Sequence, residues 1–217
     1  MPVEAPPYPV NLLVAGRQVL VVGGGAVAAE KVRGLVAAGA VVHVVANDVG
    51  DGVRALDVTW EERAYQRGEV AVYRLAVACT DDPEVNRAVF DDGEAAGVWV
   101  NAADDPAHCS YTLPARLDRG RLLVTVSTSG HSPALAGWLR DQLGEQLGPE
   151  YDTLIDLLAE ARAVMVAAGD PTLGADWRSA LDSGMLDLVR AGRLDEAREH
   201  LQASLAPVDP PQPGSLR

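Results

Sequence analysis

The sequence is poor in cysteine, in positive charge and in long apolar runs, and each shortage excludes a class of protein. It holds only two cysteines, Cys79 and Cys109, which match neither a zinc site nor a disulfide framework. Lys and Arg number 18 against 31 Asp and Glu, so the formal net charge of -13 disfavours nonspecific binding to nucleic acid or to an anionic membrane. No apolar run approaches the length of a membrane span, and the first residues lack the basic and apolar regions of a signal peptide. We therefore expect a cytoplasmic protein without nucleic-acid or membrane partners.

The segment 18–38, QVLVVGGGAVAAEKVRGLVAA, is the strongest structural signal in the chain. Residues 19–22 form an unbroken apolar run rich in valine, which predicts a central parallel strand covered on both faces. Three glycines end that strand, and an alanine-rich segment with helical spacing follows as far as Gly39. A second apolar strand at 41–46 closes a βαβ unit. The sequence thus predicts an α/β fold with a Rossmann-type parallel sheet.

The turn between this strand and helix carries a dinucleotide fingerprint. Gly23, Gly25 and Ala28 occupy the three positions of G-x-G-x-x-[G/A]. Without Cβ atoms such a turn can tighten, and a pyrophosphate can approach the free N–H groups at the helix N-terminus. We therefore predict that Gly23, Gly25, Ala26 and Val27 contact a dinucleotide. The alternative is a glycine-rich turn with a purely structural role.

Asn47 and Asp48 follow the second strand, where dinucleotide folds usually carry the acid that binds the ribose. The ribose contact could come from Asn47, from Asp48 or from backbone groups. No arginine stands immediately beside them to receive a 2′-phosphate, which favours NAD over NADP. Thr80 is a further candidate cofactor residue, because it follows a buried strand at the edge where open α/β sheets bind ligands.

Further elements follow from the same patterns. Asp82 is placed as the N-cap of a helix that has Pro83 at its first position and runs to about Ala96. A polar loop at 128–133 leads into a helix that ends near residue 147, and Gly148 and Pro149 break the chain there. Strands are predicted at 58–63, at the end of 70–79, at 99–101 and at 122–127, and three more helices at 151–168, 175–191 and 194–205.

Four segments, taken together and in this order, are more specific than the glycine turn alone: YPVNLLVAGRQVLVVGGGAVAAEKVRGLVAAGA, ACTDDPEVN, NAADDPAHCSYTLPA and VSTSGHSPALAGWLR. Together they resemble the siroheme synthase family over roughly residues 8–150. The resemblance implies NAD-dependent oxidation of precorrin-2 to sirohydrochlorin, followed in many members by insertion of Fe²⁺. It also implies a homodimer in which a segment after the Rossmann part exchanges across the two-fold axis. The methyltransferase module fused to some members has no counterpart here, so we expect the stand-alone form.

The resulting division has four parts. Residues 1–113 are the expected NAD-binding Rossmann domain, and 114–150 form a dimerisation and substrate-site segment. Residues 151–206 make a helical C-terminal domain, and 207–217 a disordered tail.

Asp104 matches the family's carboxylate after the N-x-x motif, and the resemblance implies a role for it in both reactions. Dehydrogenation removes a hydride and a proton, and metal insertion displaces pyrrole protons, so one carboxylate could act as the base in either step. From spacing alone, an acidic turn is the better explanation of Asp104-Asp105-Pro106, and the resemblance reverses that preference.

The predicted substrate residues lie in two polar loops. Hydroxyl and N–H groups in the second loop suit the carboxylates of a tetrapyrrole, although an ordinary helix cap explains them as well. His108 and Cys109 are adjacent and make a poor metal site, so no metal ligands are predicted. Arg116, Arg119 and Arg121 form either a local basic patch or an exposed turn. The substrate-binding candidates are Asn101, Ser127, Thr128, Ser129, Gly130 and His131.

Two rival functions remain open at this point. One is a dehydrogenase without metal insertion, and the other is a Rossmann module that senses NAD and catalyses nothing. The polar loops after Val100 and Val126 argue against a sensor, because both lie where a substrate should bind.

Overall fold

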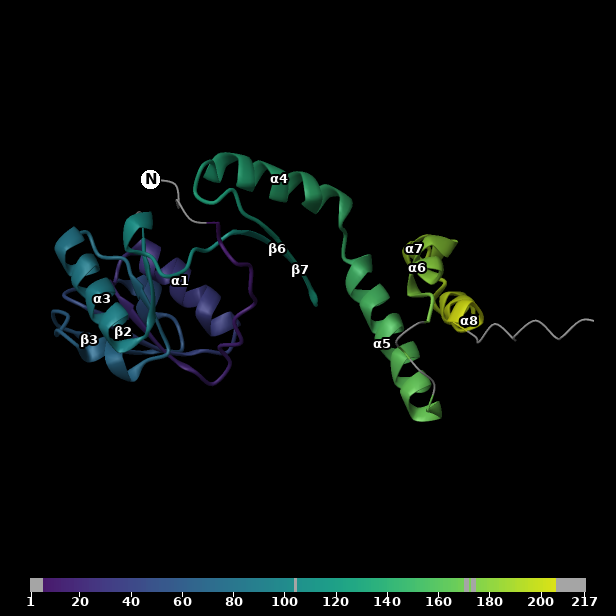
Figure 1. Cartoon of the computed structure of the whole chain (residues 1–217), viewed down its shortest axis with the longest axis horizontal. Helices are drawn as coiled ribbons and strands as arrows, with labels where there is room; N and C mark the ends of the chain where they lie inside the picture. Colours follow the sequence, from purple (N-terminus) through teal and green to yellow (C-terminus); the bar gives the residue numbers. More distant parts are fainter. Residues whose placement is uncertain (1–5, 104, 170–171, 173–174, 206–217) are drawn as a thin grey trace, which may run out of the picture. The chain divides into compact units, whose positions relative to one another are not determined.

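The computed structural model describes residues 6–103, 105–169, 172 and 175–205 (Figure 1). The chain divides into two compact units. One contains the residues up to Pro114 together with Ser127–Pro133, and the other contains Ala115–Val126 and the residues from Ala134 onward. Within the described part of the chain, no helix is long and apolar enough to cross a membrane.

The first unit is built on a five-stranded parallel sheet with the order β3-β2-β1-β4-β5. The predicted central strand is confirmed, because β1 lies in the middle of the sheet and its residues Val19 to Val22 are at most 1% exposed. The strands are β1 (Gln18–Val22), β2 (Val41–Ala46), β3 (Thr59–Glu62), β4 (Leu75–Ala78) and β5 (Trp99–Ala102).

Helices cover both faces of this sheet and create two apolar cores. Ala28, Ala29 and Val32 of α1 pack with β2 residues on one face, and Val89 of α3 packs with β4 and β5 residues on the other. Strands buried on both sides require an apolar run without alternation, as β1 and β4 have. The helices of this unit are α1 (Ala26–Ala37), α2 (Asp51–Arg54) and α3 (Pro83–Ala96), with short 3₁₀ turns η1 (Glu69–Val72) and η2 (Pro106–His108).

The strand predicted at the apolar end of 70–79 is confirmed as β4. Residues 69–72 form the 3₁₀ turn η1 after Gly68, which has φ +82°, and only Leu75–Ala78 pair with β1. Val70 lies in this 3₁₀ turn and is buried although it belongs to no strand. This burial explains why the apolar pattern of the sequence extends through the turn.

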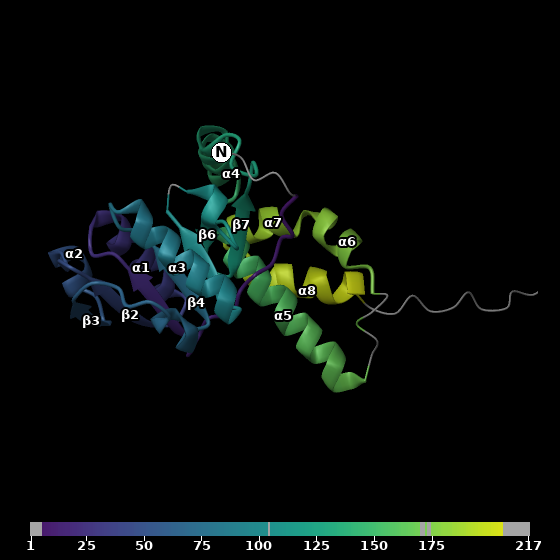
Figure 2. The ribbon, with the colours of Figure 1, turned by 60° about the vertical axis from the view of Figure 1, so that its left-hand side comes forward.

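The second unit combines an antiparallel hairpin with helices. Its hairpin pairs β6 (Ala115–Arg119) with β7 (Leu122–Val126). Helices α5 to α8 share a core centred on Leu157, Met185 and Leu201 and lie together in both views (Figures 1 and 2). The helical elements are α4 (Pro133–Gln146), α5 (Glu150–Ala168), α6 (Trp177–Ala180), the π-helical turn η3 (Leu181–Met185), α7 (Leu186–Arg190) and α8 (Leu194–Leu205).

One sequence prediction in this unit needs correction, and one alternative that the sequence left open can be decided. The single helix expected over 175–191 is interrupted at Gly184, whose φ of +89° is not helical. Arg116, Arg119 and Arg121 lie on or beside the hairpin β6–β7 and are engaged within the unit. Arg119 donates to the carbonyls of Gly144 and Leu147, Arg121 pairs with Asp156, and Arg116 lies 3.2 Å from Asp118. They therefore brace the hairpin and are not a free basic patch.

Gly93 allows α3 to lie close against β5, and its substitution tests this packing. A Cβ at Gly93 would lie 2.3 Å from Cγ2 of Val100 and 3.0 Å from the carbonyl oxygen of Val98. We expect Gly93→Ala to lower the free energy of unfolding by about 2 kcal/mol, a typical cost of overpacking a core. Urea denaturation measures this change.

Gly137 of α4 provides the matched control, because a Cβ there would meet no atom within 4 Å. Gly137→Ala should leave stability unchanged or raise it by up to ~1 kcal/mol through helix propensity. Equal effects of the two substitutions would contradict the packing role of Gly93.

Candidate functional site

The candidate site lies where the strand order of the first unit reverses. From β1 the chain proceeds outward through β2 and β3, then crosses to β4 on the other side of β1. Open α/β sheets bind ligands in the crevice outside the carboxyl ends of the strands at such a point. Gly23 follows β1 and Cys79 follows β4 at this edge, and the Cys79 N–H donates to the Val22 carbonyl at 2.8 Å.

The three consecutive glycines after β1 have different roles. Gly23 has φ +128°, and a Cβ there would lie 2.5 Å from the Cys79 carbonyl oxygen. A Cβ at Gly24 would lie 2.1 Å from the carbonyl oxygen of Asp48. At Gly25 a Cβ would meet no atom within 4 Å. The first two glycines are therefore required for packing, whereas Gly25 borders open space.

That open space faces the start of α1. Gly25 is the N-cap of the helix without a side-chain capping bond, and the first turn has no acidic residue. Ala26 and Val27 are exposed, whereas Ala28 is fully buried against the sheet. An uncapped helix N-terminus with positive dipole and no side chain in front of it fits the pyrophosphate of a dinucleotide.

The loop after β2 borders the same edge. Asn47 and Asp48 are exposed there, and the Gly50 N–H donates to the Gly24 carbonyl at 3.0 Å. The side chain of Arg54 returns to this loop and donates from Nε to the Val49 carbonyl at 2.7 Å. Arg54 was missed by the sequence reasoning, because only the four-residue helix α2 brings it back to the loop.

Thr80 is held in place by a buried amide. The Thr80 N–H donates to Oδ1 of Asn86 at 3.0 Å, and Nδ2 of Asn86 donates to the Thr80 carbonyl at 2.9 Å. Asn86 is only 7% exposed and was also missed, although its position one helical turn after Pro83 is a signal that could have found it. The predicted N-cap is confirmed, since Asp82 accepts the Glu84 N–H at 2.9 Å.

Asn101 fixes the segment that folds back along β5. Its Nδ2 donates to the Tyr111 carbonyl at 3.0 Å, and the side chain is 8% exposed. The Ser110 N–H donates to the Val100 carbonyl at 2.8 Å. This use of the amide is structural, and the predicted contact of Asn101 with substrate stays a prediction.

Asp104, the predicted catalytic base, lies outside the described residues. Of its neighbours in the chain, Ala103 donates its N–H to the Ala78 carbonyl at 2.8 Å. The carboxylate of Asp105 lies 2.6 Å from Nδ1 of His108. This hydrogen bond holds the pKa of Asp105 below its usual value, so Asp105 is an ionised turn residue.

Cys79 lies beside the glycine turn but is not a nucleophile. Burial raises the pKa of its thiol to about 12, so the reactive thiolate is scarce at neutral pH. The Cys79 side chain is partly buried and packs against the apolar core that α1 and β2 form. No group of three or more His, Cys, Asp and Glu among the described residues is arranged to hold a metal ion.

The loop Ser127–Pro133 belongs to the first unit although its neighbours on both sides belong to the second. Several of its polar groups are bonded within the loop. Oγ of Ser127 accepts the Ser129 N–H at 3.3 Å, and Oγ1 of Thr128 accepts the Ser132 N–H at 3.1 Å. Ser129 has φ +52°, the one positive value outside glycine among the described residues. His131 is exposed, and Gly130 is left-handed with φ +76°.

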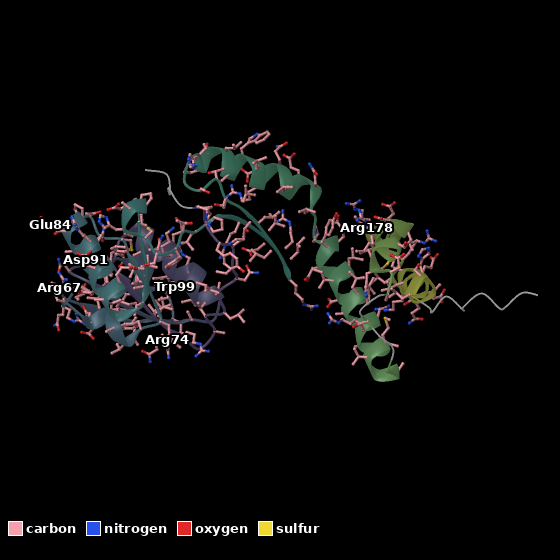
Figure 3. The ribbon with its side chains drawn as sticks, in the orientation of Figure 1. Arg67, Arg74, Glu84, Asp91, Trp99 and Arg178 are labelled. Atoms are coloured by element: carbon pink, nitrogen blue, oxygen red, sulfur yellow. The ribbon has the colours of Figure 1, made fainter. Side chains whose placement is uncertain are left out.

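Two hollows lie away from this edge. One, of about 300 Å³, lies at the amino end of the sheet between Leu12, Arg74 and Trp99, of which the latter two are labelled in Figure 3. The other, of about 420 Å³, lies in the helical unit beside Leu158 and Trp177. Parallel sheets bind ligands at their carboxyl ends, so neither hollow is the candidate site.

The parallel sheet and the glycine turn between β1 and α1 define a Rossmann-type α/β domain. Residues 10–115 match the NAD_binding_7 family of NAD(P)-binding domains.

The whole chain is similar to siroheme synthases. It is 33% identical over 214 residues to the siroheme synthase of Nitrosococcus oceani, covering 96% of this chain and 46% of the relative. The siroheme synthase of Pseudomonas putida is 37% identical over 202 residues, covering 89% of this chain and 43% of that protein. The chain thus spans a little under half the length of these curated relatives.

A solved structure extends the likeness. "SirC, precorrin-2 dehydrogenase" superposes with a TM-score of 0.68 at 26% identity, covering 91% of this chain and 98% of that one. The resemblance to the siroheme synthase family that the sequence motifs predicted is confirmed. It also extends into the helical part, which those motifs did not cover.

Substitutions at Gly25 and at Gly23 distinguish a role in binding the cofactor from a role in packing the sheet edge. Gly25→Ala adds a methyl group in open space, so it should cost less than ~1 kcal/mol of unfolding free energy. The methyl group would stand in the path of the pyrophosphate, and the Kd for a nicotinamide dinucleotide should rise at least about tenfold. Fluorescence titration of the reduced cofactor measures the Kd.

Gly23→Ala is the contrasting variant. The clash with the Cys79 carbonyl and the positive φ should make it the more destabilised protein, by roughly 2 kcal/mol or more. Normal dinucleotide affinity in Gly25→Ala would show that the open space at Gly25 is not the pyrophosphate site.

Proposed function

We propose that this chain catalyses the NAD-dependent oxidation of precorrin-2 to sirohydrochlorin in siroheme biosynthesis. The observation that carries the proposal is the open space at Gly25 in front of α1, at the reversal point of the sheet. The precorrin-2 dehydrogenase SirC, which matches along 98% of its own length, supports the substrate. A cytoplasmic location remains a prediction.

The cofactor would be held by residues from three loops. Backbone groups of Gly23, Gly25, Ala26 and Val27 would bind the pyrophosphate, and Asn47 or Asp48 the ribose. Thr80, held by Asn86, would border the crevice after β4. When bound, NAD⁺ would accept the hydride that the oxidation removes from the tetrapyrrole.

The proton that leaves with the hydride needs a base, and we assign this role to Asp104. Its chain neighbour Ala103 donates its N–H to the Ala78 carbonyl at the carboxyl end of β4. The carboxylates of the substrate would be bound by Asn101 and by hydroxyl and N–H groups of the loop residues Ser127, Thr128, Ser129, Gly130 and His131. Ser127, Gly130 and His131 are exposed.

Insertion of Fe²⁺ into sirohydrochlorin is the second proposed activity. The name siroheme synthase, carried by relatives of 33% and 37% identity, favours it. A dehydrogenase without this activity is the alternative, and the name of SirC agrees with that form equally well. Anaerobic incubation with sirohydrochlorin and Fe²⁺, followed by absorption spectroscopy, distinguishes the two. A module that only senses NAD would oxidise no precorrin-2.

Asp104→Asn tests the base directly. It preserves the size of the side chain and removes the basic carboxylate, so turnover of precorrin-2 should fall roughly 10²–10⁴-fold. The Kd for NAD⁺ should be nearly unchanged, because the pyrophosphate site lies at the glycine turn. Steady-state kinetics and a binding titration give both quantities.

Asp105→Asn is the control, because the Asp105 carboxylate is bonded to His108 and belongs to the turn. Its effect on turnover should be mild. Loss of both dehydrogenation and iron insertion in Asp104→Asn supports one shared base, and loss of one alone assigns the reactions to different groups. Normal rates in both assays would make Asp104 an acidic turn residue.

A homodimer formed by residues 114–150 is proposed from exposed apolar side chains in that segment. Leu123 of β7 is 47% exposed and Trp138 of α4 is 56% exposed in the single chain. Apolar side chains of this size are commonly buried at subunit interfaces.

Light scattering should therefore give twice the chain mass of 22.8 kDa. Trp138→Glu should shift the protein toward the monomer. Val164→Glu on α5, at a side chain that is 61% exposed outside the segment, should not. A fully active monomer under assay conditions would refute the dimer.

A further inference from the structure

Arg54 and Glu62 form a charged clamp on the loop after β2. Nε of Arg54 donates to the Val49 carbonyl at 2.7 Å, and Nη2 donates to Oε1 of Glu62. The same Oε1 accepts the Val49 N–H at 3.2 Å. The guanidinium also stacks on Trp60, with its central carbon 4.3 Å from the ring centroid. Both main-chain polar groups of Val49, its N–H and its carbonyl, are thus held by one ion pair.

The location of this clamp is the part of a dinucleotide fold that distinguishes NAD from NADP. Val49 directly follows Asn47 and Asp48, at the carboxyl end of β2. In Rossmann domains an acidic residue near this end binds the ribose 2′-hydroxyl, and a nearby arginine accommodates a 2′-phosphate. The side chains of Arg54 and Glu62 are 36% and 40% exposed, so a ligand can reach them.

The charges of the two residues have opposite effects on a 2′-phosphate. A phosphate monoester carries a charge of about -1.5 to -2 at neutral pH, so Arg54 alone would attract it. Glu62 neutralises the guanidinium, occupies one of its N–H groups and adds a negative charge beside it. The exposed Asp48 adds a further negative charge in the same loop.

We propose that Glu62, by pairing with Arg54, is the residue that sets the preference for a dinucleotide with a free 2′-hydroxyl. The inference rests on the proposed cofactor and deepens it. Without the Glu62 charge, Arg54 becomes a receptor for the adenosine 2′-phosphate. Discrimination then depends on an ion pair between α2 and β3 in addition to the residues that follow β2.

Glu62→Gln isolates the charge. Glutamine has nearly the same size and keeps an oxygen that can accept the Val49 N–H. The measurement is the Kd of NADH and of NADPH for the full-length chain, by fluorescence titration at low ionic strength, with thermal unfolding as a check on folding. NADPH binding should tighten on the order of tenfold, as expected for removing one nearby charge at a partly exposed site, while NADH binding changes little.

Two further variants locate the effect. Glu61→Gln is the matched control, since Glu61 is the adjacent residue of β3 and pairs with Arg63 and His43 instead. Successive strand residues face opposite sides of a sheet, so this change should leave the NADPH-to-NADH ratio unaltered. Adding Arg54→Gln to Glu62→Gln should abolish the gain, and added salt should reduce it.

The possible results separate this inference from the proposed function. An unchanged ratio in Glu62→Gln, an equal shift in Glu61→Gln, or a gain that survives removal of Arg54 would each overturn the role of the pair while leaving the cofactor proposal intact. Failure of every protein to bind either dinucleotide would overturn the proposed function and this inference together.

Discussion

Close approach of three backbones at the carboxyl edge of the sheet is the constraint on which the first unit depends. Gly23 lies against the Cys79 carbonyl after β4, and Gly24 against the Asp48 carbonyl after β2. A side chain at Gly23 would push away the chain that follows β4, and one at Gly24 would push away the chain that follows β2. Gly23 and Gly24 allow this close approach, whereas Gly25 borders open space at the start of α1. One run of three glycines therefore serves both the packing of the sheet edge and the open space before the helix.

In an acidic protein, the proposed site for an anionic dinucleotide needs local positive potential, and the N-terminus of α1 is one source of it. The formal net charge is -13, and the arginines beside the hairpin β6–β7 are bonded to carbonyls or acids within their own unit. Arg54, the arginine next to the proposed ribose site, is paired with Glu62. The N-terminus of α1, which has no side-chain cap, borders the open space at Gly25, and N–H groups at such a helix end favour an anion.

The sequence correctly predicted the features that depend only on residues close together in the chain. The glycine turn, the buried run of β1 and the cap at Asp82 each depend on residues within one turn or strand, and the structure has them where the sequence predicted. The missed features depend on distant partners or on a single backbone angle. Strand β6 contains alternating charges and is a strand because it pairs with β7, and the helix near residue 184 is broken by one left-handed glycine. Arg54 and Glu62 could not be paired from sequence, because the loop between them has no periodic pattern.

At the site, the glycine geometry agrees with the fingerprint, whereas the roles of Asp104 and of the loop from Ser127 remain predictions.

The two buried polar side chains of the described residues support the loops around the crevice. Asn86 holds the loop after β4, and Asn101 holds the segment after β5. An amide buried without partners costs about 1–3 kcal/mol, so each is retained only where its hydrogen bonds are made. Both amides bond to main-chain groups, and this fixes backbone positions independently of the side chains that the loops present. The backbone is thereby fixed after β4 and β5, at the carboxyl edge where open α/β sheets bind ligands. The buried polar side chains of the described residues in this unit are therefore both found beside the proposed site.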